Sequence, residues 1–352
     1  MLFRSVASRR RSRPVGAAGP VTAPELTAAS GGDRPEPGAV QEWLAAALDE
    51  LEDAVVVVDR IGREVVRNRA ARLRAEARTG ELLAEPALTN IGGSNTSYLR
   101  GTGDLPYLWS MREAASPAMR SVSFSGTAAE LEALSARLVA KGMAAPRRED
   151  YADEPGGGHG FSIRGFEGQP YRFITGDARV PAMPTQDDKP IELSHVVFNT
   201  QDRAGAMTWV RDVLGFTLSD ETRIMSFLRC DEIHHAIAVA DAKSVGLNHV
   251  AFDMRDTDAV MKGAGRLRDH GHDIAWGPGR HGPGNNVFSY FVTPFGATIE
   301  YTAEVQRVDA SYRAGRPEDW TWPPRRNDHW GIAVRDNARL HDAEKTFGFK
   351  AA

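Results

Sequence analysis

The stretch LNHVAFDMRDTDAVMKGAGRLRDHG, residues 247–271, has the pattern of a strand followed by a helix, and this pattern occurs twice in the chain. Residues 119–143, MRSVSFSGTAAELEALSARLVAKGM, align with it 128 positions earlier. A second pair, SYLRGTGDLPYLWSM at 97–111 and SFLRCDEIHHAIAVA at 226–240, aligns at an offset of 129. Each copy then continues through further strands to a glycine-containing hairpin. Because long-range self-similarity indicates a duplicated unit, we predict an α+β fold with two similar halves.

The two halves differ in their ionisable groups. The later half has His235, His249 and Glu300 where the earlier half has proline, serine and arginine. Packing requirements should be shared by both copies, so groups found in only one copy are the better candidates for chemistry. We therefore expect the active site within residues 190–305.

Composition and charge exclude several classes of protein. The net charge of −4 over 352 residues argues against nucleic acid as the main partner. Cys230 is the only cysteine, which excludes an intrachain disulfide and a cysteine-rich metal site. No stretch approaches the roughly 20 apolar residues that a membrane helix needs. We expect a cytoplasmic protein without a membrane partner, in which any metal is held by His, Asp or Glu.

The N-terminal region differs in character from the rest of the chain. Residues 1–38 begin with a basic stretch and continue rich in Ala, Gly, Pro and Thr, which predicts a disordered basic and linker segment. Residues 39–80 have a helical pattern, a strand from Val55 to Val58 and a second strand through Val65 and Val66. This piece, around VVVVDRIGREVVRNRAA, resembles the start of a PAS sensor domain. Its brevity leaves open that the N-terminus is chimeric.

Three segments of the later half carry candidate metal ligands. His195 lies in LSHVVFNT, His249 lies in GLNHVAFDM, and Glu300 lies in the second strand of a hairpin. Their separations of 54 and 51 residues are too long for a local site, but they fit three strands of one curved sheet. Two imidazoles and one carboxylate leave coordination positions free, as in non-haem Fe(II) oxygenases. Singly, each histidine also fits a hydrogen-bonded core residue, and Glu300 fits an edge-strand carboxylate.

The later half resembles the type I extradiol (ring-cleaving) catechol dioxygenases of the vicinal oxygen chelate superfamily. The matching text is LSHVVFNT, FLRCDEIHHAIAVA, GLNHVAFDM and WGPGRHGPGNNVFSYFVTPFGATIEY. The resemblance implies paired βαβββ modules, with a partial, non-catalytic N-terminal domain at 90–182 and a catalytic domain at 190–305. It places His195, His249 and Glu300 at the three ligands of an Fe(II) cofactor, and the same donors accept Mn(II).

The resemblance also assigns the residues around the metal. It gives His235 an acid–base role and places His281 and Tyr290 in the substrate pocket. An imidazole with a pKa near neutrality can both accept and return a proton. The implied reaction cleaves the ring of a catechol with O2 to a muconic semialdehyde-type product. The implied partners are the catechol, O2 and further copies of the chain in a homo-oligomer.

Several alternatives stay open from the sequence. The first N-terminal module lacks its opening elements, so an inactive chimeric or truncated product is one alternative. A glyoxalase- or isomerase-type enzyme on Zn²⁺ or Ni²⁺ is another, although the earlier half offers no ligand for it. A metal-free binding protein of the bleomycin-resistance kind is a third. Residues 306–352 form a Trp- and Pro-rich tail, which either covers the open side of the domain or a subunit interface, or docks on the surface.

Overall fold

The computed structural model describes residues 56–58, 64–67, 89–90, 96–112, 114, 116–184, 186–324 and 326–349. The chain divides into two compact units, Val6–Arg78 and Met1–Ser5 with Thr79–Ala352. In the smaller unit, β1 (Val56–Val58) and β2 (Glu64–Arg67) pair antiparallel, as the valine-rich pattern predicts. The basic segment and the rest of the PAS-like piece lie outside the described residues.

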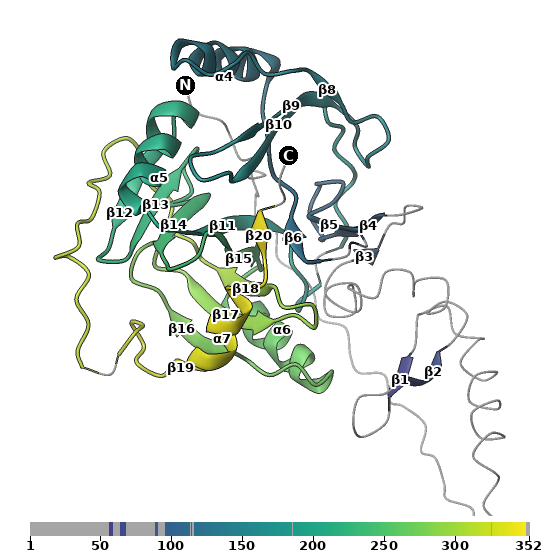
Figure 1. Ribbon diagram of the computed structural model, residues 1–352. Coiled ribbons are helices and arrows are strands. Elements are labelled where there is room, and N and C mark those ends of the chain that lie inside the picture. Colours follow the sequence, from purple (N-terminus) through teal and green to yellow (C-terminus); the bar gives the residue numbers. More distant parts are fainter. Residues whose placement is uncertain are drawn as a thin grey trace, which may run out of the picture. The chain divides into compact units, whose positions relative to one another are not determined.

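Two successive βαβββ modules form the later half of the larger unit. The first consists of β11 (Glu192–Thr200), α5 (Arg203–Trp209) with the π-helical turn η2 (Val210–Leu214), β12 (Thr217–Glu221), β13 (Met225–Arg229) and β14 (Ile237–Asp241). The second consists of β15 (Gly246–Asp253), α6 (Thr257–Asp269), β16 (Trp276–Arg280), β17 (Val287–Val292) and β18 (Thr298–Ala303). With β19 (Val334–Arg335) they form a nine-stranded sheet in the order β12-β13-β14-β11-β15-β18-β17-β16-β19 (Figure 1). The predicted α+β fold of paired modules is confirmed.

Local sequence signals set the limits of the two helices in this half. The side chains of Asp202 and Asp256 accept hydrogen bonds from the first turns of α5 and α6 and so satisfy N–H groups that the helices leave unpaired. Gly215 ends η2 in the left-handed region, at φ 82°, which favours glycine. Both helices therefore start at a residue that caps the first turn, and the α5–η2 helix ends at a glycine suited to that position.

The helices lie on one face of the sheet, which we call the outer face, and leave the inner face to the site. Helix α6 packs on β17 and β18, while α5 packs on β13 and β14 (Figure 1). Tyr301 on β18 lies against Gly263 of α6, so strand alternation directs the neighbouring Glu300 to the inner face. A small apolar cluster on the inner face comprises Val197, Phe227, Ala238 and Ala240.

The earlier half contains one complete module of the same kind. It consists of β7 (Val122–Ser125), α4 (Ala128–Ala140), β8 (Glu149–Asp150), β9 (His159–Arg164) and β10 (Pro170–Thr175), in the sheet order β7-β10-β9-β8. Before it, β3 (Thr89–Asn90), β4 (Thr96–Arg100) and β5 (Trp109–Arg112) form a separate sheet. Arg172 pairs in register with Ser123, as Glu300 pairs with Ala251, so the repeat aligns at the predicted offset. The opening strand and helix of the first module are not among the described elements.

The C-terminal tail connects the two edges of the nine-stranded sheet. Gly315 forms a bridge to Asp220 on the edge strand β12, and β19 pairs with β16 at the other edge. Helix α7 (Asn337–Ala343) follows, and β20 (Gly348–Phe349) pairs in parallel with β6 (Ala118–Met119) of the earlier half. The tail therefore contacts both edges of the sheet. None of the helices in the described part of the chain combines the length and apolar character needed to cross a membrane.

Candidate metal centre

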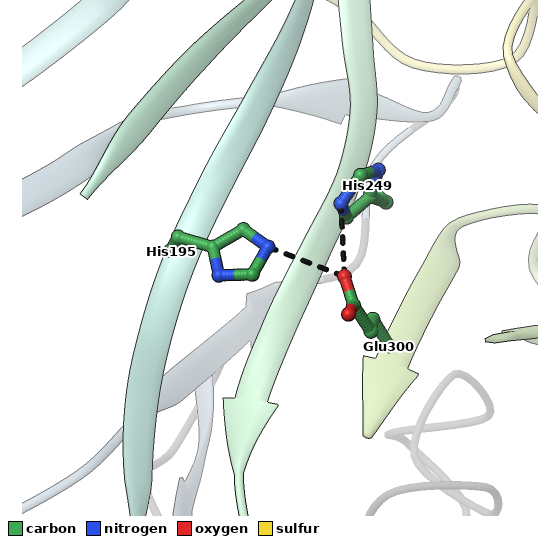
Figure 2. Close-up of side chains that lie close together, drawn as sticks. All are labelled: His195, His249 and Glu300. Atoms are coloured by element: carbon green, nitrogen blue, oxygen red, sulfur yellow. Dashed lines mark hydrogen bonds and ion pairs between the residues drawn. The ribbon is translucent and has the colours of Figure 1, made fainter. Parts of the chain in front are cut away.

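Three strands bring His195, His249 and Glu300 together on the inner face of the sheet. Ala251 of β15 is the register partner of both His195 on β11 and Glu300 on β18. His195 and Glu300 therefore lie at the same level of the sheet, on either side of β15. The Nε2 atoms of His195 and His249 lie 3.2 and 3.1 Å from Glu300 Oε2 (Figure 2). One ligand atom from each residue lies within 4.8 Å of the others, and all three side chains are buried.

The proton on His249 can be placed from its hydrogen bonds. Asn248 donates through Nδ2 to Asn199 Oδ1 at 2.7 Å, so its Oδ1 is the atom that accepts from His249 Nδ1, also at 2.7 Å. The lone pair of His249 is therefore on Nε2, which has no hydrogen-bond partner among the described residues. A buried lone pair facing a carboxylate oxygen is unfavourable unless a cation lies between them. Two imidazole nitrogens and a carboxylate oxygen fit a divalent metal ion at this position.

The protonation states also suit a metal. Burial by itself raises the pKa of the Glu300 carboxyl, but the neighbouring His195 and His249 outweigh it and hold that pKa well below its usual range. Burial lowers the pKa of His249, so its imidazole is neutral near pH 7. Asn286 donates through Nδ2 to Glu300 Oε1 at 3.2 Å and orients the carboxylate. A carboxylate with neutral imidazoles is the form in which these groups bind metals.

Tyr290 and His281 lie beside this centre. Tyr290 on β17 is the register partner of Glu300, and its hydroxyl lies 3.0 Å from His281 Nε2. Burial lowers the pKa of His281 to about 4, and burial together with the Glu300 charge raises the pKa of Tyr290 well above its usual value. Near pH 7, therefore, His281 is a neutral imidazole and Tyr290 is a phenol that can donate a hydrogen bond.

His235 lies on the other side of the centre, immediately before β14. Its ring centroid is 4.2 Å from that of His195 and 5.2 Å from that of Phe227. Burial, followed by the neighbouring His195 and His234, lowers the pKa of His235 well below its usual value, so the ring is neutral. The structure thus brings together all the residues that the sequence singles out: His195, His235, His249, His281, Tyr290 and Glu300.

The corresponding position in the earlier half has a different role. Arg172, the counterpart of Glu300, pairs with Glu154 at 2.7 Å and donates to the Tyr107 hydroxyl at 2.6 Å. This is a structural ion pair with no histidine. Over the described residues, the cluster of His195, His249 and Glu300 is the only grouping suited to a metal.

Comparisons with known proteins agree with the fold and the site. Residues 192–301 match the model of the Glyoxalase/Bleomycin resistance protein/Dioxygenase superfamily. Metapyrocatechase 2 of Cupriavidus necator is 34% identical over 124 residues, which are 34% of this chain and 39% of that protein. The iron-dependent extradiol dioxygenase of Rhodococcus jostii (strain RHA1) is 27% identical over 133 residues, 33% of this chain and 44% of that protein. The chain thus spans less than half the length of these curated relatives.

A solved structure extends the similarity over most of the chain. The Mn(II)-bound glyoxalase from Novosphingobium aromaticivorans is 31% identical and superposes with a TM-score of 0.67, covering 79% of this chain and 91% of that one. The chain belongs to the glyoxalase/bleomycin resistance/dioxygenase superfamily. The superfamily's relatives include metal-dependent enzymes, and the His-His-Glu cluster supports a metal cofactor in this member as well.

Sequence reasoning missed some of the residues that build this superfamily site. Asn248 and Asn286 orient His249 and Glu300, yet Asn248 is one amide in an apolar strand and Asn286 follows Asn285 in a glycine-rich loop. The one signal for Asn248 is that it precedes a predicted ligand in a strand. Asp220 contacts His234 behind the site, and no local pattern points to Asp220, because its other partner, Gly315, lies 95 residues further along the chain.

Proposed function

We propose that this chain is an Fe(II)-dependent extradiol dioxygenase that cleaves a catechol ring with O2 to a muconic semialdehyde-type product. The observation that carries the proposal is the convergence of His195, His249 and Glu300 from one half of the molecule, with His235 and Tyr290 on either side. The names of the relatives, a metapyrocatechase and an iron-dependent extradiol dioxygenase, support this reaction class.

In this proposal Nε2 of His195, Nε2 of His249 and Oε2 of Glu300 would hold the metal. Three protein donors would leave room at the ion for the substrate. When bound, the metal ion supplies Lewis acidity toward the catechol oxygens and a path for electrons between substrate and oxygen. Fe(II) is the proposed ion, and Mn(II) accepts the same donors.

The surrounding side chains transfer protons and orient the substrate. His235 is neutral and buried, so it can accept the proton that a catechol hydroxyl loses on binding and return it later in the reaction. The Tyr290 phenol can donate a hydrogen bond to a substrate oxygen, and His281 at 3.0 Å holds that phenol in place. Apolar Phe227 and Val197 keep the inner face poor in water beside these groups.

A second candidate is a glyoxalase-type isomerase, because the similar Novosphingobium structure is described as a Mn(II)-bound glyoxalase. Such a reaction rearranges its substrate without consuming O2. The dioxygenase is the better match for the described site, because all three candidate ligands come from one half. A proton acceptor and a phenol also lie close to them.

The test is anaerobic reconstitution of the full chain with Fe(II), followed by a panel of catechols with O2 uptake and absorbance of the yellow ring-fission product recorded together. For at least one catechol, we expect O2 uptake and the absorbance of the ring-fission product to rise together. In parallel, the chain is loaded with Mn(II) and given a 2-oxoaldehyde with a thiol. Turnover there, with no reaction on any catechol, would favour the isomerase.

A further inference from the structure

A line of buried polar groups runs from the site into the protein behind His235. Nδ1 of His235 lies 3.0 Å from Nδ1 of His234, and Nε2 of His234 lies 2.7 Å from Asp220 Oδ2. His234 and Asp220 are both 0% exposed, and His235 is 3% exposed. Asp220 is on β12, two strands away from β14 in the sheet (Figure 1), so the line crosses the sheet rather than following one strand.

The donors around Asp220 fix its role as an acceptor. The Gly315 backbone N–H donates to Oδ1 at 2.7 Å, and the Tyr312 hydroxyl lies 3.1 Å from the same oxygen. A backbone N–H can only donate, so Oδ1 is the oxygen that accepts the hydrogen bond from the C-terminal tail. Oδ2 is then the oxygen that faces His234, and it accepts the proton on His234 Nε2.

The proton positions on the two histidines follow from this. The assignment takes His234 to have a single ring proton, on Nε2 where Asp220 accepts it, which leaves a lone pair on Nδ1. The 3.0 Å contact between the two Nδ1 atoms needs one proton, which His235 must supply. The Nε2 of His235 is then unprotonated and free to accept a proton.

We propose that Asp220 and His234 are positioning residues, which hold His235 in the tautomer that has its lone pair on Nε2. The proposal rests on the proposed function, in which the substrate hydroxyl gives its proton to that nitrogen. When the proton arrives, the O–H bond of the substrate breaks and an N–H bond forms on His235. The positive charge on the ring is then balanced through His234 by the Asp220 carboxylate, and the proton leaves by the same nitrogen.

The repeat indicates that the fold does not need this line of groups. The earlier half has Leu105 and Pro106 at the positions that align with His234 and His235, and its module still forms strands there. A buried carboxylate and two buried imidazoles cost more in desolvation than apolar residues would. Their presence in the half that carries the metal ligands is explained by a role in the reaction.

The test uses Asp220→Asn, which preserves shape but replaces one acceptor oxygen by a donor. The Asn oxygen should stay with the Gly315 N–H, which has no other acceptor here, so the NH2 group faces His234. His234 must then accept at Nε2 and donate from Nδ1, and His235 must accept at Nδ1 and carry its proton on Nε2. We expect both tautomers to invert, and we expect kcat to fall about 100-fold or more while KM and metal content stay unchanged.

The direct readout is long-range ¹H–¹⁵N correlation NMR of the metal-free full chain labelled in histidine, with His235→Phe used to assign the ring. It needs neither metal nor substrate, so it can succeed or fail separately from the proposed function. The unmodified chain should show His235 protonated at Nδ1 and His234 at Nε2. Protonation of His235 at Nε2 in the unmodified chain would overturn the proposal, whether or not the variant folds.

The matched control is Asp253→Asn, which also replaces a carboxyl group by an amide, at a half-buried position on β15 outside this line. It should leave both tautomers and kcat unchanged. Equal loss of kcat in the two variants would show a general effect of replacing a carboxyl group in the sheet and would contradict the proposal. Unchanged tautomers in Asp220→Asn would contradict it as well.

Discussion

The two nitrogens of His249 have different environments, and this difference prepares the residue to bind a metal. Nδ1 donates to Asn248, while Nε2 faces the Glu300 carboxylate 3.1 Å away without a hydrogen bond. The same division occurs at His235, where the Nδ1 contact with His234 leaves Nε2 available. At the residue scale, function depends on which nitrogen of each ring a neighbour occupies.

His249→Ala should abolish metal binding. The substitution removes one of three donors and leaves the buried Glu300 carboxylate with a single imidazole. Metal content by elemental analysis after Fe(II) reconstitution and desalting should fall from stoichiometric to trace. His270→Ala, at an exposed histidine that ends α6, is the control and should bind as the unmodified chain does. Stoichiometric metal in His249→Ala would rule out the ligand assignment.

His235→Phe should separate proton transfer from metal binding. The ring lies beside His195 but the proposed role is acid–base, so removal of its nitrogens leaves the three donors in place. Metal content should stay stoichiometric while kcat on the best catechol falls by about 10²–10⁴. A rate equal to that of the unmodified chain would show that His235 does not move the proton.

At the element scale, close contact between α6 and β18 holds Glu300 in place. A Cβ atom on Gly263 would lie 3.0 Å from Met254 Cε and 3.1 Å from the Tyr301 ring, so the glycine lets the helix approach the sheet more closely than a larger residue would. Tyr301 is adjacent to Glu300 on β18. A displacement of α6 would therefore change the position of Glu300 at the site.

Gly263→Leu should destabilise the fold by about 1–3 kcal/mol, because a larger side chain must push α6 away from β18. Urea denaturation followed by circular dichroism gives the free energy of unfolding. Gly265→Ala in the same helix is the control, because no atom lies within 4 Å of its added Cβ. It should raise stability by roughly 0.5–1 kcal/mol, since glycine is unfavourable inside a helix. A neutral Gly263→Leu would contradict the packing described here.

The sequence predicts the strands of the site because apolar runs mark β11, β15 and β18. The repeat shows that the scaffold does not require His235, His249 and Glu300, while His281 and Tyr290 are predicted from the family resemblance alone. Asp220 could not be predicted in the same way. Its partners are His234 and the backbone of Gly315, and Gly315 lies 95 residues further along the chain. Contacts of that range depend on how the tail folds back, which no local pattern encodes.

At the scale of the whole molecule, the junction of the two modules contains a pair of half-buried acids. Glu192 on β11 and Asp253 on β15 are register partners. Burial raises the pKa of each to about 7, and the charge of Asp104 in the earlier half adds to the effect on Glu192. In the folded chain these acids bind protons that the unfolded chain has already released.

The contribution of this pair to stability should therefore fall as pH rises from about 5 to about 8. The buried histidines have the opposite sign, because the lowered pKa values of His249 and His281 make stability rise with pH up to about 7. A carboxyl whose pKa is raised on folding stabilises the fold while it is protonated, and that contribution is lost as it ionises near pH 7. Urea denaturation at pH 5.5 and at pH 8 measures how the free energy of unfolding changes with pH. Asp253→Asn cannot ionise, so the change in the free energy of unfolding from pH 5.5 to pH 8 should be more positive in the variant than in the unmodified chain. An equal or more negative change in the variant would show that the pair does not titrate as described.

The most direct test of the proposed ring cleavage follows the oxygen atoms of O2 into the product. The Fe(II)-loaded full chain is given its best catechol under ¹⁸O2, and the product is analysed by mass spectrometry while O2 uptake is recorded. We predict that O2 consumption equals product formation and that the ring-opened product contains both atoms of the ¹⁸O2. A folded, iron-loaded chain that consumes no O2 with any catechol, or a product free of ¹⁸O, would contradict the assignment of this site to extradiol ring cleavage.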